Sequence, residues 1–223
     1  MDKKLFLQAV IKFFCGVILV GLLVFLPAGT LGYFNGWLFM GILFIPMFIA
    51  GLVMLAKAPD LLRSRLNAKE KESEQKTVVG LSGIMFVLGF VLCGLDHRFS
   101  WSSLHTGIVI AAAAVFLASY VMYAEVLREN AYLSRVIGVR EGQKVIDTGL
   151  YGIVRHPMYS ATVFLFLSMP LVLGSLAALP IFLLYPFIIV KRIKNEEEVL
   201  SRELAGYTEY TSKVKYRLIP FIW

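Results

Sequence analysis

Long apolar runs alternate with short charged segments along most of this chain. Four runs have the length that a helix needs to cross a hydrocarbon core of ~30 Å at about 1.5 Å per residue. We expect each to form one membrane-spanning helix, including the first, which is longer than the roughly 7–15 apolar residues of a signal peptide. The four runs occupy approximately residues 5–27, 33–56, 77–95 and 104–126.

A fifth apolar run, residues 160–190, does not fit a single span. As one helix it would be about 46 Å long, and it contains helix-breaking residues at Pro170, Gly174, Pro180 and Pro186. We therefore predict two short helices that form a hairpin. A hairpin returns the chain to the face of the membrane where it began, and it brings the number of membrane-crossing segments to about six.

The tail that starts at Lys191 combines charges with apolar residues at near-helical spacing, which favours an amphipathic helix against the membrane or the bundle. These apolar residues are Val199, Leu200, Leu204, Tyr207 and Val214. The predicted fold is all-α: a polytopic transmembrane helix bundle of four full spans plus a C-terminal helical hairpin, with a cytoplasmic amphipathic C-terminal helix.

Composition and charge agree with this class. The chain is 58% hydrophobic with a mean hydropathy of +0.75, which excludes an ordinary soluble domain. All but one of its 22 Lys and Arg residues, Arg98, fall on one side of the predicted layout. By the positive-inside rule this side is cytoplasmic and carries both termini. Topology thus explains the net charge of +7, and no nucleic-acid partner is expected.

Two connectors are predicted to be simple links. The segment 57–76 is charged and is expected to be a solvated connector. The segment 96–101 is short and flanked by Trp101, as in a turn within an aromatic belt. The chain divides accordingly into residues 1–126, a four-span scaffold and acceptor pocket, and residues 127–223, which carry the candidate chemistry.

Several kinds of site are not indicated. The two cysteines lie singly in apolar runs and the three histidines are scattered, so neither a disulfide nor a metal site is predicted. The sequence contains no Gly-x-Gly, which excludes the usual dinucleotide fingerprint.

The densest polar cluster spans residues 149–159, where the linker re-enters the membrane after the extended stretch 144–149. It combines Arg155, His156 and two tyrosines with Pro157. Proline restricts the residue before it to extended geometry and is favoured in the first turn of a helix, where an anion can be held. The alternative is that these are ordinary interfacial residues with an aromatic belt.

A second polar cluster, residues 192–198, begins just after the predicted hairpin and contains Arg192, Glu196 and Glu197. Because a hairpin returns to its starting face, we expect the two clusters to meet at the membrane surface although about 40 positions separate them. Two simpler interpretations remain open: carboxylates in the first turn of a helix, and an i,i+4 salt bridge between Arg192 and Glu196.

These motifs resemble those of a known superfamily. The run Arg155-His156-Pro157-x-Tyr159, the preceding Gly149-x-Tyr151 and the later Glu196-Glu197 are similar to the pattern of the isoprenylcysteine carboxyl methyltransferases and phospholipid methyltransferases. The resemblance covers about residues 143–223, since the tail also matches at Gly206-Tyr207-x-x-Tyr210 and Leu218-Ile219-Pro220-Phe221.

The resemblance implies an integral membrane methyltransferase that binds S-adenosylmethionine and takes a lipophilic or lipidated acceptor from the surrounding membrane lipids. Arg192 and Glu196 would be catalytic, with Arg192 facing the acceptor. Many members carry a histidine where this chain has Gln143. The implied cofactor-binding residues are Gln143, Gly149, Leu150, Tyr151, Arg155, His156, Pro157, Tyr159, Glu196 and Glu197.

The acceptor is left open as an isoprenylcysteine-type carboxylate, a lipid amine or a thiol. The eukaryotic isoprenylcysteine enzymes have more spans than this chain, so their prenyl pocket cannot be carried over. The alternative function is a membrane NADPH-dependent reductase of the sterol-reductase type, although Arg155-His156-Pro157 is intact here and those enzymes typically depart from it. A membrane scaffold or transporter ranks third, because the polar residues gather at one face.

Overall fold

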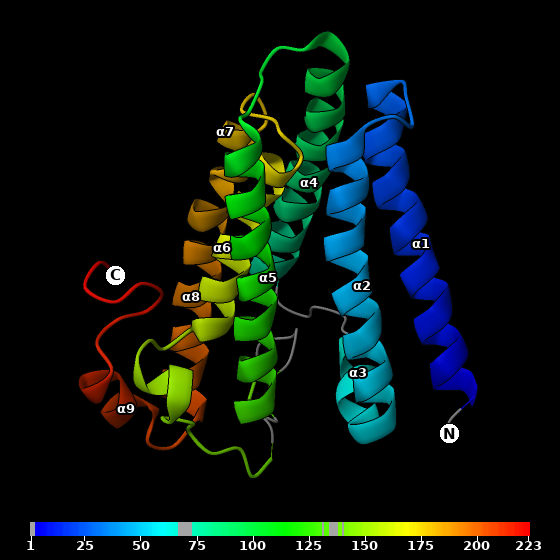
Figure 1. Cartoon of the computed structure of the whole chain (residues 1–223). Helices are drawn as coiled ribbons and strands as arrows, with labels where there is room; N and C mark the ends of the chain where they lie inside the picture. Colours follow the sequence, from blue (N-terminus) through cyan, green and yellow to red (C-terminus); the bar gives the residue numbers. More distant parts are fainter. Residues whose placement is uncertain (1–2, 67–72, 131, 134–137, 140) are drawn as a thin grey trace.

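Helices make up all the regular secondary structure in the residues described by this computed structural model, confirming the predicted all-α class. Figure 1 shows long helices standing side by side, with the short helices α3 (Pro59–Leu66) and α9 (Tyr207–Lys213) at one end of the bundle. We call the end that carries α3 and α9 the basic end. The described residues are 3–66, 73–130, 132–133, 138–139 and 141–223.

Four helices are long and apolar enough to cross a membrane, as predicted from the runs. Their surfaces are largely apolar and exposed in the isolated chain, which is the arrangement expected where lipid replaces water. The chain is therefore an integral membrane protein. The helices are α1 (Lys3–Ala28), α2 (Phe34–Lys57), α4 (Ser73–Phe99) and α5 (Thr106–Glu129).

The predicted hairpin is present and consists of α6 (Pro157–Val172), the single-turn α7 (Leu179–Phe182) and α8 (Leu184–Glu203). Gly174, with a φ of +77°, lies in the turn that follows α6. The second arm is longer than predicted, because α8 continues without a break through the charged residues after Lys191. Glu196 and Glu197 therefore lie well inside a helix, and the interpretation that placed them in a helix's first turn is wrong.

The hairpin is packed into the bundle by aromatic side chains. Figure 1 shows α6 between α5 and α8, and α6 makes its main contacts along α5. Phe39, Phe116 and Phe182 are fully buried where α2, α5 and α7 meet the rest of the core. A Cβ at Gly89 would come within 2.5 Å of the Phe182 ring, so glycine lets α4 approach the hairpin closely.

The end of the bundle opposite the basic end contains a buried carboxylate that the sequence did not reveal. Residues 96–99 belong to the last turn of α4 rather than to a loop. Asp96 is 1% exposed and accepts hydrogen bonds from the Ser102 backbone N–H at 2.7 Å and from the hydroxyls of Ser102 and Ser175. This network ties α4 to the turn of the hairpin.

The tail differs from the single amphipathic helix that was predicted. The helix α8 ends at Glu203, the chain turns at Gly206 with a φ of +83°, and α9 (Tyr207–Lys213) follows. Leu204, Tyr207 and Val214 are buried as their spacing suggested, but in a small cluster with Tyr210 that packs against the linker. Only Gly adopts this left-handed conformation easily, which explains why the helix divides there.

The connector 57–76 is also more ordered than predicted. Residues 59–66 form α3 (Pro59–Leu66), and Arg65 donates a 2.6 Å hydrogen bond to the Tyr123 hydroxyl on α5. This part of the connector is therefore packed on the bundle rather than merely solvated. Residues 67–72 lie outside the described part of the chain, as do four of the basic residues used in the charge count: Lys69, Lys71, Arg135 and Arg140.

Candidate active site

A cavity opens at the basic end of the bundle, between the linker, the start of α6, the C-terminal half of α8 and α9. It contains about 780 Å³ of empty space, a volume that includes its opening to solvent. Its apolar lining, which we call the apolar wall, includes Leu133, Val145, Ile146, Leu200 and Leu204; its polar lining, which we call the polar wall, includes Arg155, His156, Tyr159 and Glu196.

The structure brings the two predicted clusters together at this cavity. Six of the proposed site residues line it: Gln143, Tyr151, Arg155, His156, Tyr159 and Glu196. Five others are adjacent in the chain or in space but are not among the described lining residues: Gly149, Leu150, Pro157, Arg192 and Glu197. The two polar clusters therefore meet as the hairpin predicts. Six of the proposed site residues line the cavity, and the other five lie next to it.

Gly149 shapes the turn that places Tyr151 in the cavity. It has a φ of +52° and begins the short helix η1 (Gly149–Gly152). Glu129, at the end of α5, fills the space where a side chain would stand: a Cβ at Gly149 would lie 1.5 Å from its carboxylate. The same carboxylate accepts a 3.2 Å hydrogen bond from the Leu150 N–H. Gly149 and Leu150 therefore support the cavity wall from behind.

Pro157 occupies the first position of α6, as predicted, and His156 precedes it in a non-helical conformation. The backbone of this segment is held by the C-terminal tail. Arg155 N–H donates to the Tyr216 carbonyl and His156 N–H to the Arg217 carbonyl, each at 2.9 Å. The tail thus fixes the direction in which both side chains point.

Glu197 is in contact with three basic side chains. One carboxylate oxygen lies 3.2 Å from His156 Nε2 and 3.1 Å from Arg155 Nε, and the other accepts a 2.7 Å hydrogen bond from Arg217 Nε. Burial raises the pKa of this carboxyl, but the hydrogen bonds from His156 and Arg217 outweigh burial and hold the pKa below its usual value. Glu197 is ionised at neutral pH and orients the polar wall.

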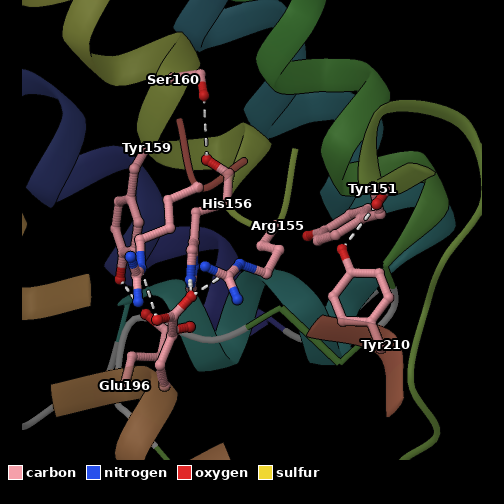
Figure 2. Close-up of polar contacts among 9 residues, drawn as sticks. Tyr151, Arg155, His156, Tyr159, Ser160, Glu196 and Tyr210 are labelled. Carbon is pink, nitrogen blue, oxygen red and sulfur yellow. Dashed lines mark hydrogen bonds and ion pairs between the residues drawn. The ribbon is translucent and has the colours of Figure 1, made fainter. Parts of the chain in front are cut away.

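Tyr159 connects the two residues predicted to be catalytic. Its hydroxyl donates a 2.5 Å hydrogen bond to Glu196 and accepts a 2.9 Å hydrogen bond from Arg192 Nε. Figure 2 shows Tyr159 and Glu196 pointing toward one another beside His156 and Arg155. Glu196 lines the cavity, whereas Arg192, which is 8% exposed, lies beyond Tyr159.

Several cavity residues were not predicted from the sequence. Asn130 donates a 2.9 Å hydrogen bond to the Tyr151 hydroxyl, and Tyr210 donates one of 2.7 Å to the Tyr151 carbonyl; Figure 2 shows the Tyr210 contact. Tyr207 also lines the cavity. The motif Gly206-Tyr207-x-x-Tyr210 marked the two tail tyrosines without giving them a role, whereas nothing in the sequence pointed to Asn130.

Fold and site together define a helical membrane protein with a cavity of mixed polar and apolar lining at the basic end of its bundle. Residues 103–205 match the family model described as phospholipid methyltransferase, which supports a membrane methyltransferase. The matched region begins just before α5 and runs through α8, and so contains both polar clusters. The superfamily inferred from the motifs is confirmed.

The chain is also similar to a reductase. It is 28% identical over 85 residues to the Delta(14)-sterol reductase TM7SF2 of Mus musculus. This alignment covers 37% of the present chain and 20% of the mouse protein. The similarity is thus confined to a fifth of that protein, and it does not outweigh the methyltransferase match.

Proposed function

We propose that this protein transfers a methyl group from S-adenosylmethionine to a lipophilic acceptor at the cytoplasmic face of a membrane. The observation that carries the proposal is the cavity itself: residues of both polar clusters form one wall, inside the region that matches the methyltransferase family. The orientation follows from the basic residues, which favour the cytoplasmic side.

The residues present fit such a cofactor. S-adenosylmethionine supplies an activated methyl group on a sulfonium, joined to an adenosine and to a zwitterionic amino acid. The apolar wall formed by Leu200, Leu204 and Val145 suits a purine base. The opposite wall offers Glu196 to an ammonium group and Arg155 to a carboxylate, which are matched charges for the amino-acid end.

Glu197 takes a supporting role in this proposal. Its carboxylate is already engaged by Arg155, His156 and Arg217, so it holds Arg155 and His156 in place instead of binding the ammonium group directly. Gly149, Leu150 and Pro157 act likewise by fixing the backbone. Gln143 lines the cavity where many family members carry histidine, and a glutamine amide can offer both a donor and an acceptor.

Methyl transfer from a sulfonium is an in-line displacement, so the protein mainly has to align donor and acceptor and exclude water. Tyr159 lies between Glu196, on the cavity side, and Arg192, on its far side. We place the reacting groups near this tyrosine. Arg192 would orient a carboxylate acceptor, whereas Glu196 would remove a proton from an amine or a thiol.

The acceptor would reach this point from the bilayer. Two small apolar cavities flank α6 and share Phe164: one reaches Ile219 and Pro220 in the tail, the other Ile108 on α5. Their lining is almost entirely apolar, which suits a lipid chain rather than a soluble substrate.

Binding of an NADPH-type cofactor is the second candidate, supported by the partial similarity to the sterol reductase. A titration of the purified protein in detergent with S-adenosylmethionine and, separately, with NADPH distinguishes the two. We expect saturable binding of S-adenosylmethionine and transfer of its labelled methyl group into the lipid or thiol fraction. Saturable binding of NADPH without binding of S-adenosylmethionine would replace the proposal with the reductase.

A further inference from the structure

Tyr207 presents a buried hydroxyl that has no hydrogen-bond partner among the described residues. The side chain is 4% exposed and lines the cavity. Buried polar groups are normally hydrogen-bonded, because leaving one unpaired forfeits the hydrogen bonds it made to water. A hydroxyl in this state at a ligand cavity indicates that the ligand supplies its partner.

The position of the ring does not depend on this hydroxyl. The ring packs with Leu204, Tyr210 and Val214, and the chain reaches it through the left-handed turn at Gly206. Tyr210 makes an informative contrast, because its hydroxyl is engaged with the Tyr151 carbonyl at 2.7 Å. The two tyrosines therefore differ in one respect. The Tyr210 hydroxyl makes a hydrogen bond within the protein, whereas the Tyr207 hydroxyl makes none to the described residues.

Tyr207 also stands at the boundary between the two walls of the cavity. Its ring belongs to the apolar cluster that includes Leu200 and Val145. Burial raises the pKa of its hydroxyl, and the nearby carboxylates of Glu197 and Glu196 raise it further. The hydroxyl is therefore close enough to the polar wall to interact electrostatically with its carboxylates. It remains protonated at neutral pH and available as a donor.

We propose that the Tyr207 hydroxyl binds a ribose hydroxyl of the cofactor. The inference rests on the proposed function, in which the base lies on the apolar wall and the amino-acid end on the polar wall. In S-adenosylmethionine the ribose connects those two parts, so it falls at the boundary where Tyr207 lies. A ribose hydroxyl can accept the hydrogen bond that the tyrosine has available.

The test compares wild type with Tyr207→Phe, using S-adenosylhomocysteine and its 2′-deoxy and 3′-deoxy analogues as calorimetric probes. We expect Tyr207→Phe to weaken S-adenosylhomocysteine binding about tenfold. One deoxy analogue should show a similar loss with wild type and little further loss with the variant. The ligand-free variant should unfold at the wild-type temperature or higher, since it no longer buries an unpaired hydroxyl. The control, Tyr210→Phe, should lower that temperature.

Each other outcome overturns the inference. Unchanged affinity of Tyr207→Phe would show that the hydroxyl meets no ligand, and a lower unfolding temperature without ligand would show that it has a partner in the free protein. Equal deoxy penalties in both proteins would exclude the ribose. If wild type binds NADPH but not S-adenosylhomocysteine, the proposed function fails, and the NADPH affinities of the two proteins then test Tyr207 separately. Binding of neither ligand overturns both.

Discussion

His156 Nε2 and Glu197 Oε1 lie 3.2 Å apart although 41 positions separate the two residues in the sequence. The contact joins the start of α6 to α8, and it is the point where the two polar clusters of the sequence meet. Because the side chains are only 5% and 11% exposed, the interaction is shielded from water and from salt.

Replacing Glu197 by Gln should destabilise the protein more than it changes any single ligand contact. The substitution leaves Arg155, whose side chain is 9% exposed, without its counter-charge, and breaking a buried ion pair costs about 3 kcal/mol or more. We expect a lower midpoint of thermal unfolding in detergent, followed by intrinsic fluorescence, and weaker cofactor binding. Glu198→Gln is the matched control, because Glu198 is exposed on the same helix. Equal midpoints for the two variants would contradict this account.

Acid should remove the same stabilisation. The folded-state pKa of Glu197 lies below the usual value of a glutamate, so the carboxylate contributes stability that is fully present above the unfolded pKa. This contribution is lost as the pH falls through the lower, folded-state pKa. A pH series of unfolding midpoints should therefore fall steeply below about pH 4 for wild type and less steeply for Glu197→Gln. Parallel curves would show that other carboxylates dominate.

Replacing Arg192 by Gln should lower turnover more than cofactor affinity. Arg192 is not among the described lining residues of the cavity but donates a hydrogen bond to the Tyr159 hydroxyl, so its loss disturbs the alignment of Tyr159 and the acceptor. We expect kcat to fall at least about tenfold, with the Kd for S-adenosylmethionine within about twofold. Transfer of labelled methyl groups and calorimetry measure the two quantities. A variant with wild-type kcat and a raised Kd would instead make Arg192 a cofactor ligand.

Gly149→Ala should change the shape of the cavity although Gly149 is not among the described residues that line it. The φ of +52° and the position of the Glu129 carboxylate both oppose a side chain there. A residue forced into this conformation costs about 1–3 kcal/mol, and the turn that carries Tyr151 should shift. Gly51→Ala is the control, since a Cβ at Gly51 meets nothing within 4 Å. The expected result is reduced cofactor affinity in Gly149→Ala alone.

Asp96→Ala should lower the stability of the protein without changing its affinity for the cofactor. It removes the acceptor of three hydrogen bonds at the far end of the bundle, which should lower the free energy of unfolding by about 1–3 kcal/mol. Cofactor affinity at a temperature where the variant remains folded should equal that of wild type. Reduced affinity under those conditions would mean that the two ends of the bundle are coupled.

Sequence alone predicts the parts of this molecule that depend on local properties. Span length and apolar composition identify α1, α2, α4 and α5, and the prolines identify the hairpin, because each follows from a single segment. The meeting of the clusters at residues 149–159 and 192–198 then follows from topology, since a hairpin must return to its starting face.

Other features depend on partners that are distant in sequence. Asp96 is predicted in a turn of the aromatic belt because its segment is short and flanked by Trp101, yet Ser175, 79 positions away, donates a hydrogen bond to the buried carboxylate. The alternative interpretation placed Glu196 in the first turn of a helix, but Glu and Lys are themselves good helix formers, and so α8 continues through them. The supporting role of Glu129 behind Gly149 requires knowing which segment packs against the turn.

The contacts between the tail and residues 155–160 also have a consequence for biosynthesis. Arg155, His156 and Ser160 are held by the carbonyl groups of Tyr216, Arg217 and Leu218, which are translated about 60 residues later. The spans can enter the bilayer as they emerge, but the polar wall is fixed only after the tail has left the ribosome. A nascent chain stalled before Tyr216 should thus be inserted in the membrane and yet unable to retain the cofactor.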